Sequence, residues 1–311
     1  MTRPVGRVAL LGLLAGLVAV AIVATVLHDR AAAPDSLQRQ AAERMASAFP
    51  VLVSALEARG HEIDARVDPN RTGLIGEEFT VLTTTVGALS AKRTSTNPAF
   101  ASLIVGWLRD LDLQAGDAVL ISLSGSFPAL GIAAIVACET LGLEPIVLSS
   151  VGASMYGANR PDFTWLDIEA ILRDAGVIAH TTARASLGGE GDIGLSYPDG
   201  GREAALAAIE RSGVAALIEE TAEAQWASKA AFADSVGSRA LINVGGNQLA
   251  VGPDGHLLAP GLVTRTGVSA ERFGLIGRFR ERGLPVIHLL RIRDLAVEHG
   301  LPLDPIPLPS P

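Results

Sequence analysis

The chain has 311 residues, of which 49% are hydrophobic, and a formal net charge of −8. This composition is that of a folded protein with a full core rather than a disordered one, and the acidic balance argues against general nucleic-acid binding, which needs a broad basic surface. The single cysteine, Cys138, excludes an intrachain disulfide and a cysteine-rich metal site. It stands among small apolar residues, which indicates a buried thiol.

The first predicted element is an apolar segment near the N-terminus. Residues 8–27 carry no charge, and at about 1.5 Å of rise per residue they match the roughly 30 Å hydrocarbon core of a bilayer. Arg3 and Arg7 precede the segment, so the positive-inside bias predicts a cytoplasmic N-terminus and an extracytoplasmic soluble part. A cleaved signal peptide is the alternative, with the alanines at 31–33 as its cleavage site. We expect a cytoplasmic tip and a single-pass anchor over residues 1–33.

A helical segment follows the expected anchor. Residues 34–60 predict a helix, capped by Asp35 or Ser36, that serves as a stalk or as the first helix of the domain. No linker rich in proline, glycine or serine divides the rest of the soluble part, so we expect one α/β domain over residues 61–300. Five prolines in residues 301–311 predict an extended tail.

The expected strands of the domain are short, continuous apolar runs, as in strands that are covered on both faces. Their alternation with helices predicts right-handed crossovers and a mostly parallel sheet. The expected fold is therefore α/β, a Rossmann-like three-layer arrangement with helices on both faces of a mostly parallel sheet, preceded by one N-terminal transmembrane helix. Strands are predicted at residues 118–123, 145–149, 177–181, 214–218, 240–244 and 285–289, and helices at 128–141, 164–174, 202–212, 222–236 and 270–282.

Small polar residues follow several of the predicted strands. Ligands bind beyond the carboxyl ends of the strands in an open parallel sheet, so we expect these residues to form one polar edge, here named the crest. Its hydroxyls, amides and backbone N–H groups suit an anionic or amide-rich ligand. Each residue alone is also explained as a helix cap or a turn. The crest candidates are Ser124, Gly125, Ser126, Ser150, Ser154, Asn159, Asn243, Gly245 and Gly246.

A segment upstream of the first predicted strand adds cations to the candidate site. Lys92 is one of two lysines in the chain, and Arg93, Thr94 and Asn97 follow it closely. A lysine and an arginine amid hydroxyl and amide groups can receive a carboxylate or a phosphate. The alternative is a solvated loop that leads into a helix at Pro98.

The sequence contains no complete catalytic or metal-binding motif. Ser126 does not lie in a G-x-S-x-G elbow, no P-loop is present, and the six histidines are dispersed. We therefore predict neither a metal nor a cofactor and assign no catalytic residue. Because lysine can act as the base for a serine, a pair of Lys92 with Ser124 or Ser126 is kept as an alternative.

Several blocks of the sequence resemble one known family. The likeness covers about residues 62 to 308 and is carried by TGLIGEEFT, LSGSFPAL, LSSVGASMYGANRPDFTWLDIE, GGEGDIG, NVGGNQ and VIHLLRIRDLAVEHGLPLDP. These blocks resemble the poly-gamma-glutamate system proteins, which are membrane-anchored proteins linked to capsule or slime operons that make poly-gamma-glutamate. The resemblance implies a pathway, a place at the cell membrane and partners among the synthase or export subunits. It supplies no catalytic residue.

Three hypotheses for the function follow. The first is an accessory component of poly-gamma-glutamate synthesis or export, in which the crest holds the anionic polymer or its chain end. The second is a serine-dependent amidase or transferase that acts on γ-glutamyl or cell-wall amides. The third is a scaffold that organises the synthase subunits through the anchor and the arginine-rich segment 270–294. Binding is favoured over catalysis, because the G-x-S-x-G elbow and an obvious histidine partner are absent, and because Ser126 is well placed to cap the helix that starts at Phe127-Pro128.

Overall fold

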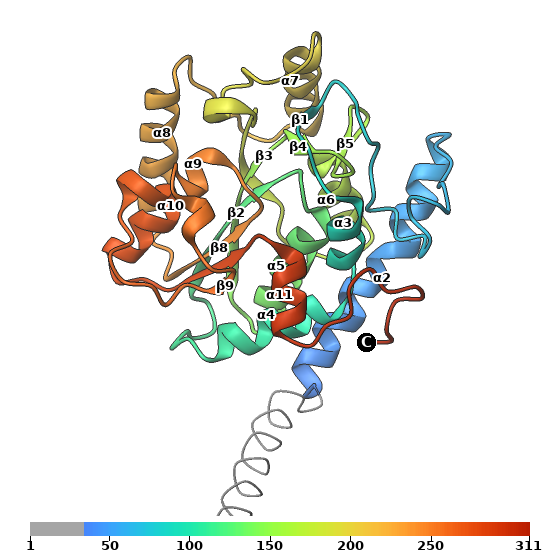
Figure 1. Cartoon of the computed structure of the whole chain (residues 1–311), viewed down its shortest axis with the longest axis horizontal. Helices are drawn as coiled ribbons and strands as arrows, with labels where there is room; N and C mark the ends of the chain where they lie inside the picture. The colour runs from blue at the N-terminus through green and yellow to red at the C-terminus, as the bar shows by residue number, and fades with distance from the viewer. Residues whose placement is uncertain (1–33) are drawn as a thin grey trace, which may run out of the picture. The chain divides into compact units, whose positions relative to one another are not determined.

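A six-stranded sheet lies at the centre of the computed structural model, which describes residues 34–311 (Figure 1). Its strands are β2 (Ala118–Ser124), β3 (Glu144–Ser150), β7 (Thr182–Ser186), β8 (Ala240–Val244), β9 (Gly261–Leu262) and β10 (Val286–Leu289). They are ordered β7-β3-β2-β8-β10-β9 across the sheet. Every pair of neighbours is parallel except β10 and β9. The prediction of an α/β fold with a mostly parallel sheet is therefore confirmed.

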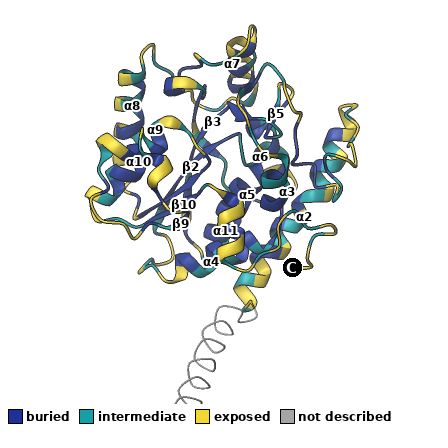
Figure 2. Cartoon of the chain, in the orientation of Figure 1, coloured by how far each residue is buried: buried dark blue, intermediate teal, exposed yellow. Residues whose placement is uncertain are grey.

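Helices cover both faces of the sheet. Successive side chains of a strand point to opposite faces, and because both sets are apolar here, both faces need a helical cover. Ile121 and Ile242 belong to one core cluster, whereas Leu120 and Leu241 belong to another. Figure 2 shows the buried residues concentrated in the strands and on the inner sides of the helices. The first cluster takes in α2 (Ser36–Ala58), α4 (Ala99–Arg109), α5 (Pro128–Thr140), α6 (Trp165–Asp174), α7 (Gly201–Ser212) and α11 (Ile292–Glu298), and the second takes in α8 (Ala222–Ser235), α9 (Gln248–Val251) and α10 (Ala270–Glu281).

Four predicted strands and all five predicted helices of the domain match the structure to within one residue at each end. The other two predicted strands are wrong. Residues 177–181 form the connection before β7, and residues 214–218 contribute only an isolated bridge between Ala216 and Ala185. Val177 and Ile178 are buried in the main core, so their apolar character reflects packing rather than a strand.

The helix that follows the N-terminal segment is part of the domain. α2 buries Met45, Leu52 and Leu56 in the main core and packs against α4, α5 and α6. Each leucine removed from water in this way contributes roughly 2 kcal/mol. Of the two alternatives for residues 34–60, this packing favours the first helix of the domain over a stalk.

The expected transmembrane span, residues 8–27, lies outside the described residues. Within residues 34–311, no helix is both long enough and apolar enough to cross a membrane.

The C-terminal residues 301–311 contain neither helix nor strand, as predicted for a proline-rich tail. Asp304 fixes this tail to α3 (Leu89–Ser95), because its carboxylate pairs with Arg93 at 3.1 Å and its backbone N–H donates to Thr94 Oγ1 at 3.0 Å. The tail therefore packs on the helix that carries Lys92.

Candidate functional site

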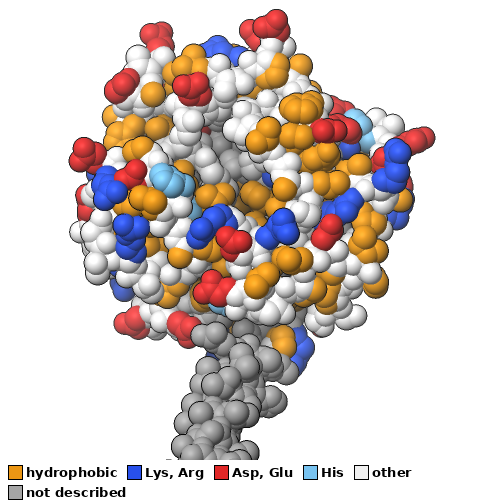
Figure 3. All heavy atoms as spheres, viewed as in Figure 1, with side chains coloured by type: hydrophobic (Ala, Val, Ile, Leu, Met, Phe, Trp, Pro, Cys, Tyr) orange, Lys and Arg blue, Asp and Glu red, His pale blue; other side chains and the backbone are white. Residues whose placement is uncertain are grey.

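The carboxyl ends of the central strands border a cavity of about 380 Å³, which is here named the crest cavity. The neighbouring strands β2 and β8 lead into α5 and α9, which cover opposite faces of the sheet, so the cavity lies where an open α/β sheet usually binds its ligand. Its walls are mostly serine, threonine, glycine, asparagine and glutamine, and its charged lining residues are Lys92 and Glu190. Figure 3 shows that this face of the molecule is hollowed near its centre.

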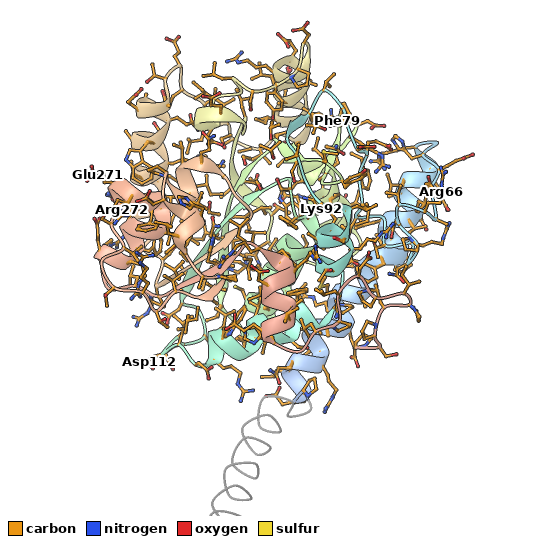
Figure 4. The ribbon with its side chains drawn as sticks, viewed as in Figure 1. Arg66, Phe79, Lys92, Asp112, Glu271 and Arg272 are labelled. Carbon is orange, nitrogen blue, oxygen red and sulfur yellow. The ribbon has the colours of Figure 1, made fainter. Side chains whose placement is uncertain are left out.

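Lys92 is buried at the wall of the crest cavity, on α3, with only 2% of its surface exposed. Its Nζ lies 2.7 Å from Ser154 Oγ, donates to the carbonyl oxygen of Ser126 and stands 3.9 Å from the centre of the Phe127 ring. In the described part of the chain, no carboxylate pairs with it. Figure 4 shows Lys92 near the middle of the molecule in this view.

Burial changes the protonation of Lys92. Removal of the ammonium from water disfavours its charged form, which lowers the pKa of Lys92 to about 7. The expectation of a solvated loop around this residue is wrong, because residues 89–95 form α3 and turn Lys92 inward.

Four of the predicted serines, Ser124, Ser126, Ser150 and Ser154, line the crest cavity together. Ser126 Oγ accepts a hydrogen bond from the Ser154 N–H at 3.0 Å, and Ser150 Oγ accepts one from Asn247 Nδ2 at 3.3 Å. Ser124 Oγ is buried and has no hydrogen-bond partner within residues 34–311. The expected capping of α5 by Ser126 is not observed: Phe127 occupies the N-cap position, and no side chain caps the helix.

Two short strands hold Ser154 in place. β1 (Thr83–Thr85) pairs with β4 (Ala153–Ser154) in parallel, with Thr85 opposite Ser154. Gly125 packs closely against β4 and the residues before it. A Cβ at that position would stand 2.7 Å from the carbonyl oxygen of Val151 and 3.1 Å from Ala153 Cβ. Close backbone approach of this kind requires glycine, so the predicted Gly125 supports the site without lining it.

Arg93 and Thr94 point away from the crest cavity. The Arg93 guanidinium donates to the Val67 carbonyl oxygen at 2.9 Å and pairs with Asp304, while Thr94 Oγ1 donates to the Ser90 carbonyl oxygen at 2.7 Å. Successive residues of a helix point in different directions, so the inward position of Lys92 turns its two followers toward the tail. The hypothesis that Lys92 and Arg93 form one anion site is therefore wrong.

The predicted amide residues have structural roles. Asn97 Oδ1 accepts from the Ala99 N–H at the start of α4, and the Asn159 side chain bonds both the N–H and the carbonyl oxygen of Glu77. Asn243 Nδ2 contacts His288 Nδ1 at 3.0 Å between neighbouring strands. Among the predicted glycines, Gly246 lines the crest cavity, and Gly245 stands next to it, where a Cβ would lie 2.5 Å from Ser124 Oγ.

A buried ion pair behind the cavity wall was not predicted. Asp192 Oδ2 lies 2.6 Å from Lys229 Nζ, and both side chains are almost completely buried. Asp192 Oδ1 also accepts from Asn247 Nδ2 at 2.6 Å, and Oδ2 accepts from Gln225 Nε2 at 3.1 Å. The pair therefore ties the wall loop around Asp192 to the start of α9. The run GGEGDIG is a sequence signal for this tight loop, but it does not indicate the partner on α8.

Within the described residues, no group of three histidine, cysteine, aspartate or glutamate side chains is placed to hold a metal ion. Comparison of the chain with protein-family models, with curated proteins and with solved structures finds no match. Fold and site together define an α/β protein with a mostly parallel sheet and a hydroxyl-lined cavity at the carboxyl ends of its central strands.

Proposed function

We propose that this protein is a membrane-anchored accessory component of poly-gamma-glutamate synthesis or export, and that its crest cavity binds the end of the polymer chain. The observation that carries the proposal is the make-up of the cavity: hydroxyls, amides and backbone groups gathered at the strand ends, with one buried lysine in its wall. The uncharged run at residues 8–27 supports the anchor, and the preceding Arg3 and Arg7 favour an extracytoplasmic domain.

A chain of isopeptide amides matches these walls chemically. Its carbonyl oxygens and carboxylates need donors and its N–H groups need acceptors, and a hydroxyl can serve as either. A cavity of about 380 Å³ is in the range of small-molecule sites, so it suits the end of a chain rather than its length.

The molecular surface argues against holding the polymer along its length. The net charge of −8 repels a polyanion. The arginine-rich segment 270–294 is largely neutralised, because Arg278 and Arg282 pair with Asp234, and Arg272 pairs with Asp254. This segment is therefore poorly suited to bind the polymer.

A large side chain that fills the crest cavity should weaken the binding of γ-linked glutamate oligomers. A Cβ at Gly246 would meet only Leu290 Cδ1, at 3.8 Å, so Gly246→Trp introduces a large side chain at the cavity without a backbone clash. We expect calorimetry on the full-length chain to show binding of a γ-linked glutamate pentamer, and at least tenfold weaker binding by Gly246→Trp. Glu203→Trp, on the exposed side of α7, is the matched control and should bind normally.

The same titration with an α-linked glutamate pentamer tests whether the isopeptide linkage is recognised. Equal affinity for both oligomers would remove the polymer from the proposal. Unchanged affinity in Gly246→Trp would place the ligand site elsewhere.

A further inference from the structure

The contact between Lys92 and Ser154 has the geometry of a base and its nucleophile. The 2.7 Å separation of Lys92 Nζ and Ser154 Oγ is within hydrogen-bond range, and both residues line the crest cavity. We propose that Ser154 is a nucleophile and Lys92 its general base, so that the crest cavity transfers acyl groups from amides. This inference rests on the proposed function for the identity of the amide, a γ-linked amide that carries a neighbouring carboxylate.

The surroundings of Lys92 favour a neutral amine over a permanent cation. A neutral lysine has two N–H bonds and one lone pair: one N–H donates to the Ser126 carbonyl oxygen, and the lone pair can accept the Ser154 hydroxyl proton. Burial of the side chain lowers the pKa of Lys92 to about 7, and among residues 34–311 no carboxylate partner is present to raise it again. Lys229, the other lysine of the chain, has Asp192 as its partner and so lacks these properties.

Two further features support attack by Ser154. A Cβ at Gly87 would lie 3.1 Å from Ser154 Oγ, so glycine at this position leaves room beside the hydroxyl. The backbone N–H groups of Ser126 and Phe127 have no hydrogen-bond acceptor within residues 34–311. They stand just before α5, where Ser126 Oγ accepts from the Ser154 N–H. Free N–H groups in such a position can stabilise the oxyanion of a tetrahedral intermediate.

The reaction then proceeds in two balanced steps. Ser154 Oγ attacks the amide carbon while its proton passes to Lys92 Nζ, and collapse of the intermediate breaks the C–N bond and returns that proton to the leaving amine. The product is an ester on Ser154 and a released amine. Water or a second amine then attacks the ester carbon and gives its proton to Lys92. Collapse of this second intermediate breaks the bond to Ser154 Oγ, which takes the proton from Lys92, and releases the acyl group as an acid or as a new amide. Water makes the site an amidase and an amine makes it a transferase.

The test uses the γ-(4-nitrophenyl) ester of N-acetylglutamic acid as a probe of the full-length chain. We expect a burst of nitrophenol equivalent to the protein, an N-acetylglutamyl group on Ser154 by peptide mass spectrometry, and an acylation rate that rises with pH to a plateau above about pH 7. Ser154→Ala should lose the adduct and at least 100-fold of the rate. Lys92→Arg should lose a similar factor, because arginine stays protonated.

Ser235→Ala, at the exposed end of α8, is the serine control and should acylate normally. The inference is overturned by an unchanged rate in Ser154→Ala, by an adduct on another residue, or by no adduct on the wild-type chain. Titration with the γ-linked pentamer separates the two proposals. An adduct on Ser154 without binding of the pentamer keeps the nucleophile and removes the polymer, whereas binding without any adduct keeps the ligand site and removes the nucleophile.

Discussion

Replacement of Lys92 by methionine should stabilise the protein, raising its free energy of unfolding at pH 6 by about 1 kcal/mol. The fall of the Lys92 pKa from 10.5 to about 7 on folding corresponds to a penalty of roughly 5 kcal/mol when the amine is protonated in both states. Loss of the amine leaves the Ser126 carbonyl oxygen and Ser154 Oγ without a donor, which costs about 1–3 kcal/mol for each. Methionine has a similar length and no charge, so a net gain remains.

The stability difference between Lys92→Met and the wild type should depend on pH in a definite direction. Because the pKa is lower in the folded state, the penalty is fully present below pH 7 and is relieved as the pH rises toward 10.5. The stability advantage of Lys92→Met over the wild type should therefore be largest at acidic to neutral pH and should shrink in alkaline buffer. Urea unfolding of both chains between pH 6 and pH 10 measures it. A methionine variant that is less stable at pH 6 would mean that Lys92 has a structural role.

A lysine that destabilises its own fold is better explained by a functional role than by packing. Residues kept at a cost in stability are typical of binding and catalytic sites. The combination expected of Lys92→Met, higher stability with loss of acylation, would connect the fold to the two proposals. A purely structural lysine would lose both together.

The fold could be predicted where a continuous apolar run forms a strand or an apolar periodicity forms a helix. It could not be predicted where a segment is apolar only because it packs in the core. The run at residues 118–123 predicts β2 because a strand covered on both faces is continuously apolar. The run at residues 177–181 begins with buried apolar residues too, but the N–H groups of Ala179 and His180 donate to Glu139 Oε1, at 2.8 and 2.9 Å, instead of to a neighbouring strand. Tertiary hydrogen bonds of this kind leave no periodicity in the sequence.

The crest was predictable in part, as far as it depends on the direction of the strands. Parallel strands bring their carboxyl ends to one edge, so Ser124, Ser126 and Ser150 were expected to meet there, and they line one cavity. The partner of Lys92 could not be derived, because it depends on the direction in which α3 turns and on the pairing of β1 with β4. The sequence offered Ser124 or Ser126 for this pair, and the structure places Ser154 Oγ there.

Replacement of Lys229 by methionine should have the opposite effect to the same change at Lys92. Removal of the ammonium leaves the carboxylate of Asp192 buried without its cation, and such changes cost about 3–5 kcal/mol. The hydrogen bonds from Asn247 and Gln225 remain but do not supply a positive charge. We expect urea unfolding to show this loss. Binding of the γ-linked pentamer should weaken as well, because Asn247 lines the cavity and is held by Asp192.

The double variant Asp192→Asn with Lys229→Met separates the buried charge from the loss of packing. An asparagine keeps the shape of Asp192 and removes the unpaired charge, but its single oxygen can accept from only one of Gln225 and Asn247, so about half of the lost stability should return. If the double variant is as unstable as Lys229→Met alone, the cost comes from the shape of methionine rather than from the orphaned carboxylate. With Lys92→Met more stable and Lys229→Met less stable than the wild type, the two lysines would be distinguished by one physical difference: Lys229 has a buried carboxylate beside it and Lys92 has a serine.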